Sequence, residues 1–322
     1  MARNPQLNAH NDLQNLLSIE GLSKALLQKA LDTANSLIQQ ETLELVYVRW
    51  LKSLSVFNLF FESAPYIQNS FEIAAKRLSA EVFNVNLDDK SSSLAVREAL
   101  NHTIAMNANI VVIRHSNSGT AHFAAQYLPE HIHVINAGDG QFADPTRVLH
   151  DMLILQHVKE SFTDIRVALV GDILHSALAR SHIHALSILG VPEIRVIAPK
   201  ILLPAEIESL GVHIYSDLET GLKDMDVVIV SELPTSQYKN SLFPSSSEYF
   251  YTYGITEDKL KVAHPDVCVL PSGKLTENTE ISATLTLSMT QLLSSYPLFG
   301  VAIRMAIMAM ITQKVPSLST SS

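Results

Sequence analysis

The stretch Arg166-Val-Ala-Leu-Val-Gly-Asp-Ile-Leu-His-Ser176 decides the fold, because a short apolar run ends in a glycine and a polar loop. A run of this length, closed by Gly171, is typical of a strand covered on both faces. Residues 177–189 follow with helical spacing of apolar positions, and residues 194–198 and 227–230 are two further apolar runs. Strand, helix and strand in this order predict a parallel sheet with helices on both faces.

The same alternation is present earlier in the chain. Apolar runs that predict strands occur at residues 56–61, 81–85, 110–113 and 133–135, and a helix is expected around residues 71–78. Apolar positions in residues 13–40 recur at helical spacing and predict one or two amphipathic helices at the start. The predicted fold class is therefore α/β, with two doubly wound parallel-sheet domains joined by interdomain helices.

The predicted domain boundaries follow from these patterns. We expect an N-terminal domain over residues 1–150 and a C-terminal domain over residues 151–297, with the boundary in a helix near residues 145–158. A final helix, residues 298–313, is apolar on most faces and is expected to pack back on the N-terminal domain.

Composition excludes several classes of protein. The 322 residues carry a formal net charge of −9, which argues against nucleic-acid and anionic-membrane surfaces, since both need clustered Lys and Arg. Cys268 is the single cysteine, so an internal disulfide and a cysteine zinc cage are excluded. The start of the chain lacks the apolar run of a signal peptide, and no membrane-spanning stretch occurs. A cytoplasmic protein is expected.

Three motifs resemble a known family. Leu59-Phe-Phe-Glu62 precedes Ser70-Phe-Glu-Ile-Ala-Ala-Lys-Arg-Leu78, Val112-Ile-Arg-His115 precedes Asn136-Ala-Gly-Asp-Gly140, and the third is Val170-Gly-Asp-Ile-Leu-His-Ser176. In this order they are similar to aspartate carbamoyltransferase catalytic chains, within the aspartate/ornithine carbamoyltransferase superfamily. The resemblance covers about residues 6–312, and Gly138-Asp-Gly140 favours the aspartate branch.

That resemblance implies an N-terminal domain for carbamoyl phosphate, a C-terminal domain for aspartate, and trimers. The aspartate amine attacks the carbamoyl carbon and phosphate leaves, so such a site must hold several negative charges. No metal or organic cofactor is implied. The chain start is similar to the bacterial branch that assembles with an active or inactive dihydroorotase.

The carbamoyl phosphate half of the site departs from the family pattern. The family's phosphate loop reads Ser-Thr-Arg-Thr-Arg, and it clamps phosphate with hydroxyls, two guanidinium groups and a helix N-terminus. Val96 replaces a lysine that the family supplies from a neighbouring subunit, and Arg97 next to it is expected to be a solvated surface arginine. The five matching loop positions here are Ala64, Pro65, Tyr66, Ile67 and Gln68.

The expected carbonyl-polarising histidine is also missing. Asp144-Pro-Thr-Arg147 stands where the family has His-Pro-Thr-Gln, with Thr146 retained. Asp144, directly before a proline, is expected to be a helix N-cap. Arg147, three residues later, could form an ion pair with Asp144. Arg114 is the matching cation that remains, and two interpretations stay open for it, a structural anchor or an anion contact.

The aspartate half has lost its cations too. Ala177 and Glu232 stand where the family places arginines, and an acid at position 232 reverses the sign of the interaction with a substrate carboxylate. His175 and Ser176 remain but suit packing and capping equally well. Gly273 is what is left of a late segment that helps to hold the carbamoyl group.

The leading hypothesis is a catalytically silent homologue linked to pyrimidine biosynthesis, with no catalytic residues expected. It would act as a structural or regulatory subunit, either as a homotrimer or in a mixed assembly with an active carbamoyltransferase or a dihydroorotase-like chain. The alternative is an enzyme of changed specificity for an amino acid or another anion, with an anion site built from Arg97, Arg114, Arg147 and Lys274. Tight binding of an anionic ligand would distinguish the two hypotheses.

Overall fold

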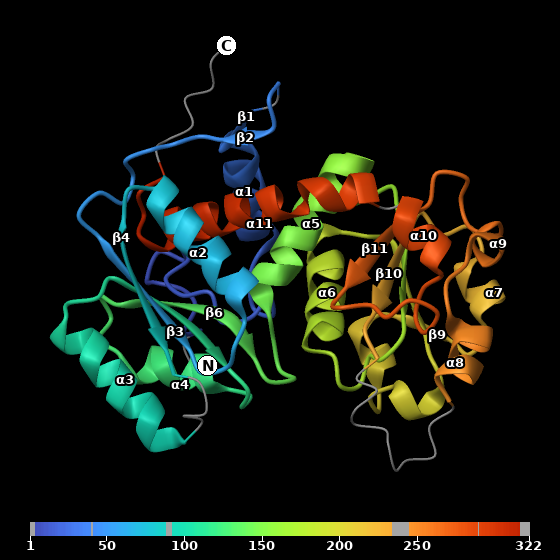
Figure 1. Ribbon diagram of the computed structural model, residues 1–322, viewed down its shortest axis with the longest axis horizontal. Coiled ribbons are helices and arrows are strands. Elements are labelled where there is room, and N and C mark those ends of the chain that lie inside the picture. The colour runs from blue at the N-terminus through green and yellow to red at the C-terminus, as the bar shows by residue number, and fades with distance from the viewer. Residues whose placement is uncertain (1–3, 40, 88–91, 234–244, 289, 316–322) are drawn as a thin grey trace. The chain divides into compact units, whose positions relative to one another are not determined.

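The computed structural model describes residues 4–39, 41–87, 92–233, 245–288 and 290–315. The chain forms two compact units: unit 1 comprises Met1–Leu153 and the chain from Tyr296 onward, and unit 2 comprises Ile154–Ser295. Helices α5 (Pro145–Lys159) and α11 (Thr290–Ile311) both run through a unit boundary (Figure 1). Each unit contains a parallel sheet, which confirms the predicted α/β class.

Unit 1 is built on a four-stranded sheet with the order β4-β3-β5-β6, in which all neighbours are parallel. β3 and β5 are central and consist almost entirely of buried residues. A short antiparallel pair, β1 and β2, lies outside this sheet. The strands of unit 1 are β1 (Ile38–Gln39), β2 (Glu44–Leu45), β3 (Ser55–Phe60), β4 (Glu81–Asn86), β5 (Ile110–His115) and β6 (His133–Asp139).

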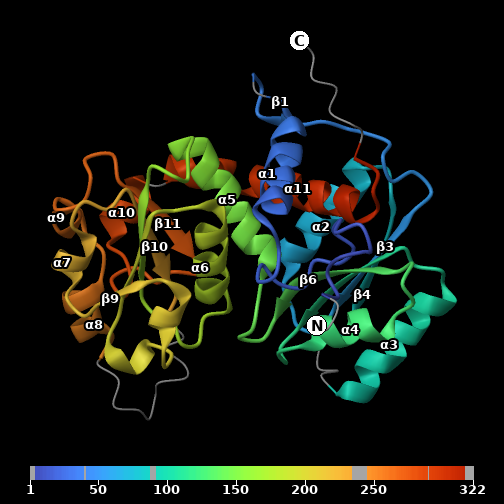
Figure 2. The same cartoon turned by 180° about the vertical axis from the view of Figure 1, so that it is seen from behind.

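Helices cover both faces of this sheet. Side chains alternate along a strand, so Phe57 and Leu59 face one core with α3 and α4, while Val56 and Phe60 face the other side. Helix α2 packs against β3 and β4, and Figure 2 shows α1 alongside α11. The remaining helices of unit 1 are α1 (Lys24–Ser36), α2 (Pro65–Arg77), α3 (Ser93–Ala105) and α4 (Thr120–Tyr127).

Unit 2 repeats this construction with five parallel strands in the order β11-β10-β7-β8-β9. Residues Val227–Ser231 of β10 are all buried, as expected for a central strand covered on both faces. The strands are β7 (Arg166–Val170), β8 (Glu193–Ile197), β9 (His213–Tyr215), β10 (Val227–Ser231) and β11 (Cys268–Ser272).

The helices of unit 2 lie on both faces of its sheet. α6 buries an apolar stripe that includes Ile183 and Leu186, while a second core joins Val228 and Val230 to residues of α7, α9 and α10. These elements are α6 (Ala177–Leu189), α7 (Leu218–Leu222), α8 (Ser246–Tyr253), α9 (Glu257–Leu260) and α10 (Ala283–Ser288), with 3₁₀ turns at Lys200–Leu202 and Ile207–Leu210.

The prediction of helix over residues 13–22 is wrong. The backbone N–H of Leu16 donates to Val134 (2.9 Å), and the N–H of Asn136 donates to Leu16 (2.8 Å), so this segment pairs with β6. Leu16 and Leu17 are fully buried there. Closely spaced leucines imitated helical periodicity, whereas the helix itself starts at Lys24, after its N-cap Ser23.

Two other helices start earlier than expected. α2 begins at Pro65 rather than near residue 71, because proline suits the first helical position. α11 begins at Thr290 rather than near residue 298, with Pro297 inside it. Among the described residues, none of the helices combines the length and apolar character needed to cross a bilayer.

Candidate functional site

The segment predicted to match the family's phosphate loop, residues 64–68, forms the start of α2 after β3. Ala64 is the N-cap residue and supplies no side-chain hydrogen bond, and Pro65 at the next position has no N–H. Tyr66 is 90% exposed, so its ring points into solvent. The backbone N–H of Gln68 donates to the Ala64 carbonyl (3.0 Å). This turn therefore offers no cationic side chain, and Pro65 removes one of the backbone N–H donors of a helix start.

Arg114, on β5 beside β3, is held by groups of unit 1 itself. Its Nη2 lies 2.6 Å from the Glu62 carboxylate, and its Nη1 donates to the Ala137 carbonyl (2.8 Å) and lies 3.9 Å from the Asp144 carboxylate. Gly138, at φ +116°, leaves room for the guanidinium, since a Cβ there would stand 2.2 Å from Nη1. Two carboxylates thus lie beside the Arg114 guanidinium.

Asp144 caps α5, as the Asp-Pro pair predicted. Its Oδ1 accepts the backbone N–H of Arg147 (3.1 Å) and lies 3.3 Å from the Thr146 hydroxyl. Arg147 also forms an ion pair with Asp151, one turn further along the helix (3.1 Å). Side chains four residues apart lie on the same face of a helix, which suits this pair.

Arg304 on α11 adds a buried cation to unit 1. It is 6% exposed, its Nη1 donates to the Gly300 carbonyl (2.8 Å), and its guanidinium lies over the Phe71 ring at 4.7 Å. Burial lowers its pKa to about 10, while the charges of Asp144 and Asp151 oppose that shift. The buried charges of this region therefore depend on one another for their neutralisation.

In unit 2, the loop after β7 positions His175 and Ser176. The buried Asp172 carboxylate accepts the backbone N–H of His175 (3.0 Å) and lies 3.0 Å from His175 Nδ1. Ser176 is the N-cap of α6, and its hydroxyl accepts the N–H of Ala179 (3.2 Å). Both side chains thus contact their own loop and helix, and Ala177 presents no cation beside them.

Glu232 and Gly273 meet at the carboxyl ends of β10 and β11. The Glu232 carboxylate accepts the backbone N–H of Lys274 (2.9 Å), and a Cβ at Gly273, φ +110°, would stand 2.7 Å from the same oxygen. Burial raises the pKa of the neighbouring Glu280, although its carboxylate accepts the N–H groups of Leu233 and Thr276. The charge of Glu232 raises the pKa of Glu280 further, so this edge is acidic.

Another group of side chains in unit 2 could hold a cation. Ligand atoms of Asp226, His264 and Asp266 lie within 4.8 Å of one another in the described part of the chain. However, Lys159 donates to Asp266 (2.8 Å), and this bond, more than His264, lowers the pKa of Asp266 to about 2. The ammonium group already supplies the positive charge that a metal ion would bring. Burial raises the pKa of nearby Cys268, which disfavours a reactive thiolate.

The structure thus brings the predicted residues together as two sets, one at the carboxyl edge of each sheet, where α/β proteins bind ligands. Sequence reasoning missed Glu62, Asp151 and Arg304. Glu62 and Asp151 could have been predicted from the sequence, since Glu62 directly follows an apolar strand and Asp151 is four residues after Arg147. Arg304, within an apolar helix, carries no local signal of its partners.

Two family models and several solved structures match the chain over most of its length. The profile described as "Aspartate/ornithine carbamoyltransferase, carbamoyl-P binding domain" matches residues 14–157, and "Aspartate/ornithine carbamoyltransferase, Asp/Orn binding domain" matches residues 163–311. Together the two profiles cover most of the chain.

Three solved structures share the fold. Ornithine carbamoyltransferase from Pyrococcus furiosus has a TM-score of 0.80 and 18% identity, covering 94% of this chain and 98% of that one. Aspartate transcarbamoylase from Trypanosoma cruzi with phosphate has a TM-score of 0.77 and 22% identity, covering 96% and 98%. The same enzyme with N-(phosphonacetyl)-L-aspartic acid has a TM-score of 0.74 and 21% identity, covering 95% and 98%.

Proposed function

The chain belongs to the aspartate/ornithine carbamoyltransferase superfamily, and on this premise we propose that it is a catalytically silent member of the aspartate branch. It keeps both sheets of the family but not the charges that carbamoyl phosphate and aspartate need. Its role is that of a structural or regulatory subunit linked to pyrimidine biosynthesis.

The observation that carries this proposal is the state of Arg114. It is the one matching cation retained at the reaction centre, and its guanidinium contacts the Glu62 carboxylate at 2.6 Å with Asp144 at 3.9 Å. An incoming phosphate would have to displace Glu62 and tolerate Asp144. Both carboxylates repel a dianion, so the remaining cation is neutralised where a substrate would need it.

The number of charged contacts that are missing supports inactivity rather than weak activity. Positions 66, 68, 144, 177 and 232 hold Tyr, Gln, Asp, Ala and Glu where the resemblance implies Arg, Arg, His, Arg and Arg. Each charge-assisted contact contributes about 1.5–3 kcal/mol, so five lost contacts forfeit roughly 7 kcal/mol or more. At about 1.4 kcal/mol for each factor of ten, the rate falls by about five orders of magnitude.

A turnover assay tests the catalytic half of the proposal. Purified protein is incubated with carbamoyl phosphate and either L-aspartate or L-ornithine, and released phosphate is measured beside an active aspartate carbamoyltransferase. We expect no release above the uncatalysed rate with either amino acid. Turnover at ordinary enzymatic rates would refute the proposal.

A subunit role requires an assembly. We propose a homotrimer or a mixed complex with an active carbamoyltransferase or a dihydroorotase-like chain, because the packed cores of both units are intact while the site is not. Native mass measurement of the complex recovered from its own cells should give a mass above that of one chain, 35.5 kDa. A monomer throughout the physiological concentration range would contradict this role.

The alternative, an enzyme of altered specificity, would need free cations at the site. The Arg97 guanidinium instead lies over the Phe123 ring at 5.8 Å, and Arg147 pairs with Asp151 at 3.1 Å. A thermal-shift screen of phosphates, carboxylates and amino acids tests this alternative, since a ligand at 100 times its Kd stabilises by about 2.7 kcal/mol. A shift that Arg114→Met abolishes would favour the alternative.

A further inference from the structure

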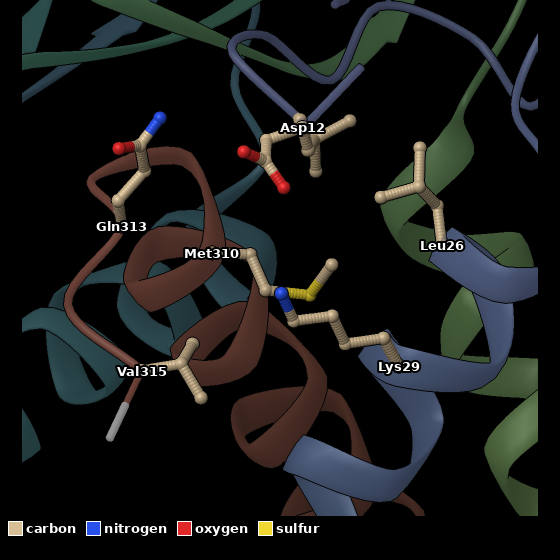
Figure 3. A pocket seen from close by; sticks show the side chains of 7 residues that line it. Asp12, Leu26, Lys29, Met310, Gln313 and Val315 are labelled. Carbon is tan, nitrogen blue, oxygen red and sulfur yellow. The ribbon is translucent and has the colours of Figure 1, made fainter. Parts of the chain in front are cut away.

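A separate cavity lies within unit 1, away from every residue of the candidate site. It has a volume of about 160 Å³ and is formed by the N-terminal loop, helix α1 and the carboxyl end of α11 (Figure 3). Unlike an enclosed apolar cavity of roughly 150 Å³, which holds a molecule of the size of benzene, this pocket is open to solvent, and its volume suits a small polar ligand of about six to nine non-hydrogen atoms. Its lining residues are Asp12, Leu13, Leu26, Lys29, Met310, Gln313 and Val315.

Two opposite charges face this cavity without neutralising each other. Asp12 enters from the N-terminal loop and Lys29 from α1, and both side chains point into the space beside Met310 in Figure 3. Among the described residues, neither side chain has an ion-pair or hydrogen-bond partner. The loop that carries Asp12 is fixed by its backbone, because Asp12 N–H donates to the Asn8 side chain (3.0 Å) and Asn8 N–H donates to the Asp12 carbonyl (3.0 Å).

The lining of the cavity combines buried apolar side chains with exposed polar ones. Of the lining residues, Leu13 and Met310 are buried, 3% and 5% exposed, while Lys29 and Gln313 are exposed. Helix α11 ends here, with Gln313 at φ +55° and its N–H donating to the Met310 carbonyl (3.0 Å). The carboxyl end of a helix carries partial negative charge, which adds to that of Asp12 in favouring an ammonium group.

We propose that this cavity is a binding site for a small aliphatic α-amino acid. The ligand ammonium group lies between Asp12 and the end of α11, and its carboxylate contacts Lys29 and the Gln313 amide. The aliphatic side chain packs on Met310, with Leu26 and Val315 beside it. A zwitterion can contact both charges at once, whereas a simple anion or a simple cation gains only one charge-assisted contact.

Calorimetric titration of the full chain with L-valine tests this site. We expect a Kd of about 1 mM or tighter, which corresponds to roughly 0.5 kcal/mol for each non-hydrogen atom of the ligand. Isobutylamine lacks the carboxylate and 3-methylbutanoate lacks the amine, so each should bind at least tenfold more weakly. L-Tryptophan should be excluded by size.

Substitutions assign the site to these residues. Asp12→Asn and Lys29→Met should each weaken L-valine binding at least tenfold, because each removes one charge-assisted contact. Asp32→Asn and Lys24→Met change exposed charges of the same helix outside the cavity and should leave binding unchanged. Circular dichroism shows that each variant is folded.

Two results would overturn the proposal. One is the lack of saturable binding by the wild type up to 10 times the expected Kd. The other is binding that persists unchanged in both Asp12→Asn and Lys29→Met. Neither result bears on the candidate site at Arg114, which shares no residue with the cavity, so the proposed function is tested independently.

Discussion

The carboxyl edges of the two sheets hold their charged side chains in different ways. In unit 1 a cation survives, but Glu62 and Asp144 surround Arg114, and the adjoining charges are buried with one another. In unit 2 the Glu232 carboxylate accepts the backbone N–H of Lys274 beside Gly273. The difference shows that the charged residues of unit 1 contact one another and support its packing, whereas those of unit 2 mainly make the charge of its sheet edge negative.

The largest expected effect is in the buried charges of unit 1. Asp151→Ala removes an acid that is fully buried, pairs with Arg147 and offsets the charge of buried Arg304. We expect a loss of about 3–5 kcal/mol in the free energy of unfolding, because breaking a buried pair leaves uncompensated charge. Urea denaturation measures it.

The matched control is Asp258→Ala in unit 2, whose ion pair with Lys261 is exposed. Screened surface pairs contribute little, so its unfolding midpoint should equal that of the wild type. Equal midpoints for the Asp151 and Asp258 variants would show that the buried charges of unit 1 are not structural.

Glycine substitutions compare the backbone of the two edges. Gly171→Ala in unit 2 places a Cβ 2.7 Å from the Ser231 carbonyl oxygen at φ +122°, so backbone must move. We expect a loss of about 2–4 kcal/mol, from a strained conformation together with overpacking. Gly138→Ala in unit 1 meets a side-chain end, Arg114 Nη1, rather than backbone, and should cost about 1–3 kcal/mol, from its positive φ and from shifting the guanidinium off the Ala137 carbonyl. Thermal denaturation of both variants checks the order, and a larger loss for Gly138→Ala would reverse our interpretation.

Adding arginines to the first turn of α2 should have a smaller effect, a modest rise in the affinity of unit 1 for phosphate. Tyr66→Arg with Gln68→Arg places two guanidinium groups on the first turn of α2, where the family resemblance implies arginines. We expect phosphate affinity to rise roughly tenfold, less than two full contacts would give, because Glu62 and Asp144 remain. Calorimetry with inorganic phosphate measures it, and Lys76→Arg, on the last turn of α2, is the control for added guanidinium. Unchanged affinity in the double variant would mean that the loop is not the limiting defect.

The smallest effect concerns pH. Burial raises the folded-state pKa of Glu280 above its ordinary value of 4.5, so ionisation opposes folding. The neutral Glu280 carboxyl therefore favours the folded state. Its contribution to stability is greatest below pH 4.5 and is lost as the pH rises through the raised pKa. Glu280→Gln loses one of the two accepting oxygens at every pH, but its stability should not decline, as that of the wild type does, when the pH rises above 4.5, measured by urea denaturation. Asp139→Asn in unit 1 should behave alike, since burial raises the pKa of Asp139 too. Parallel pH profiles for wild type and variants would contradict both expectations.

The fold was largely predictable, because buried strands such as Val227–Ser231 and the helix Ala177–Leu189 have local periodic signals. Residues 13–22 were not, since the partner of Leu16 lies in β6, more than a hundred residues away. At the site, Asp144 as a helix cap was readable from its neighbour Pro145. The contacts of Arg114 and Arg304 depend on tertiary packing, so no local pattern predicts them.

Titration of the full chain with N-(phosphonacetyl)-L-aspartic acid, the compound bound in a Trypanosoma cruzi aspartate transcarbamoylase structure, tests the central claim most directly. This compound presents a phosphonate and two carboxylates together, so it probes both kinds of lost contact. Our account predicts no saturable heat at ligand concentrations up to about 1 mM, where binding is worth roughly 4 kcal/mol. Saturable binding with a micromolar Kd would show that the cations of an active site are functionally replaced, and would contradict a silent homologue.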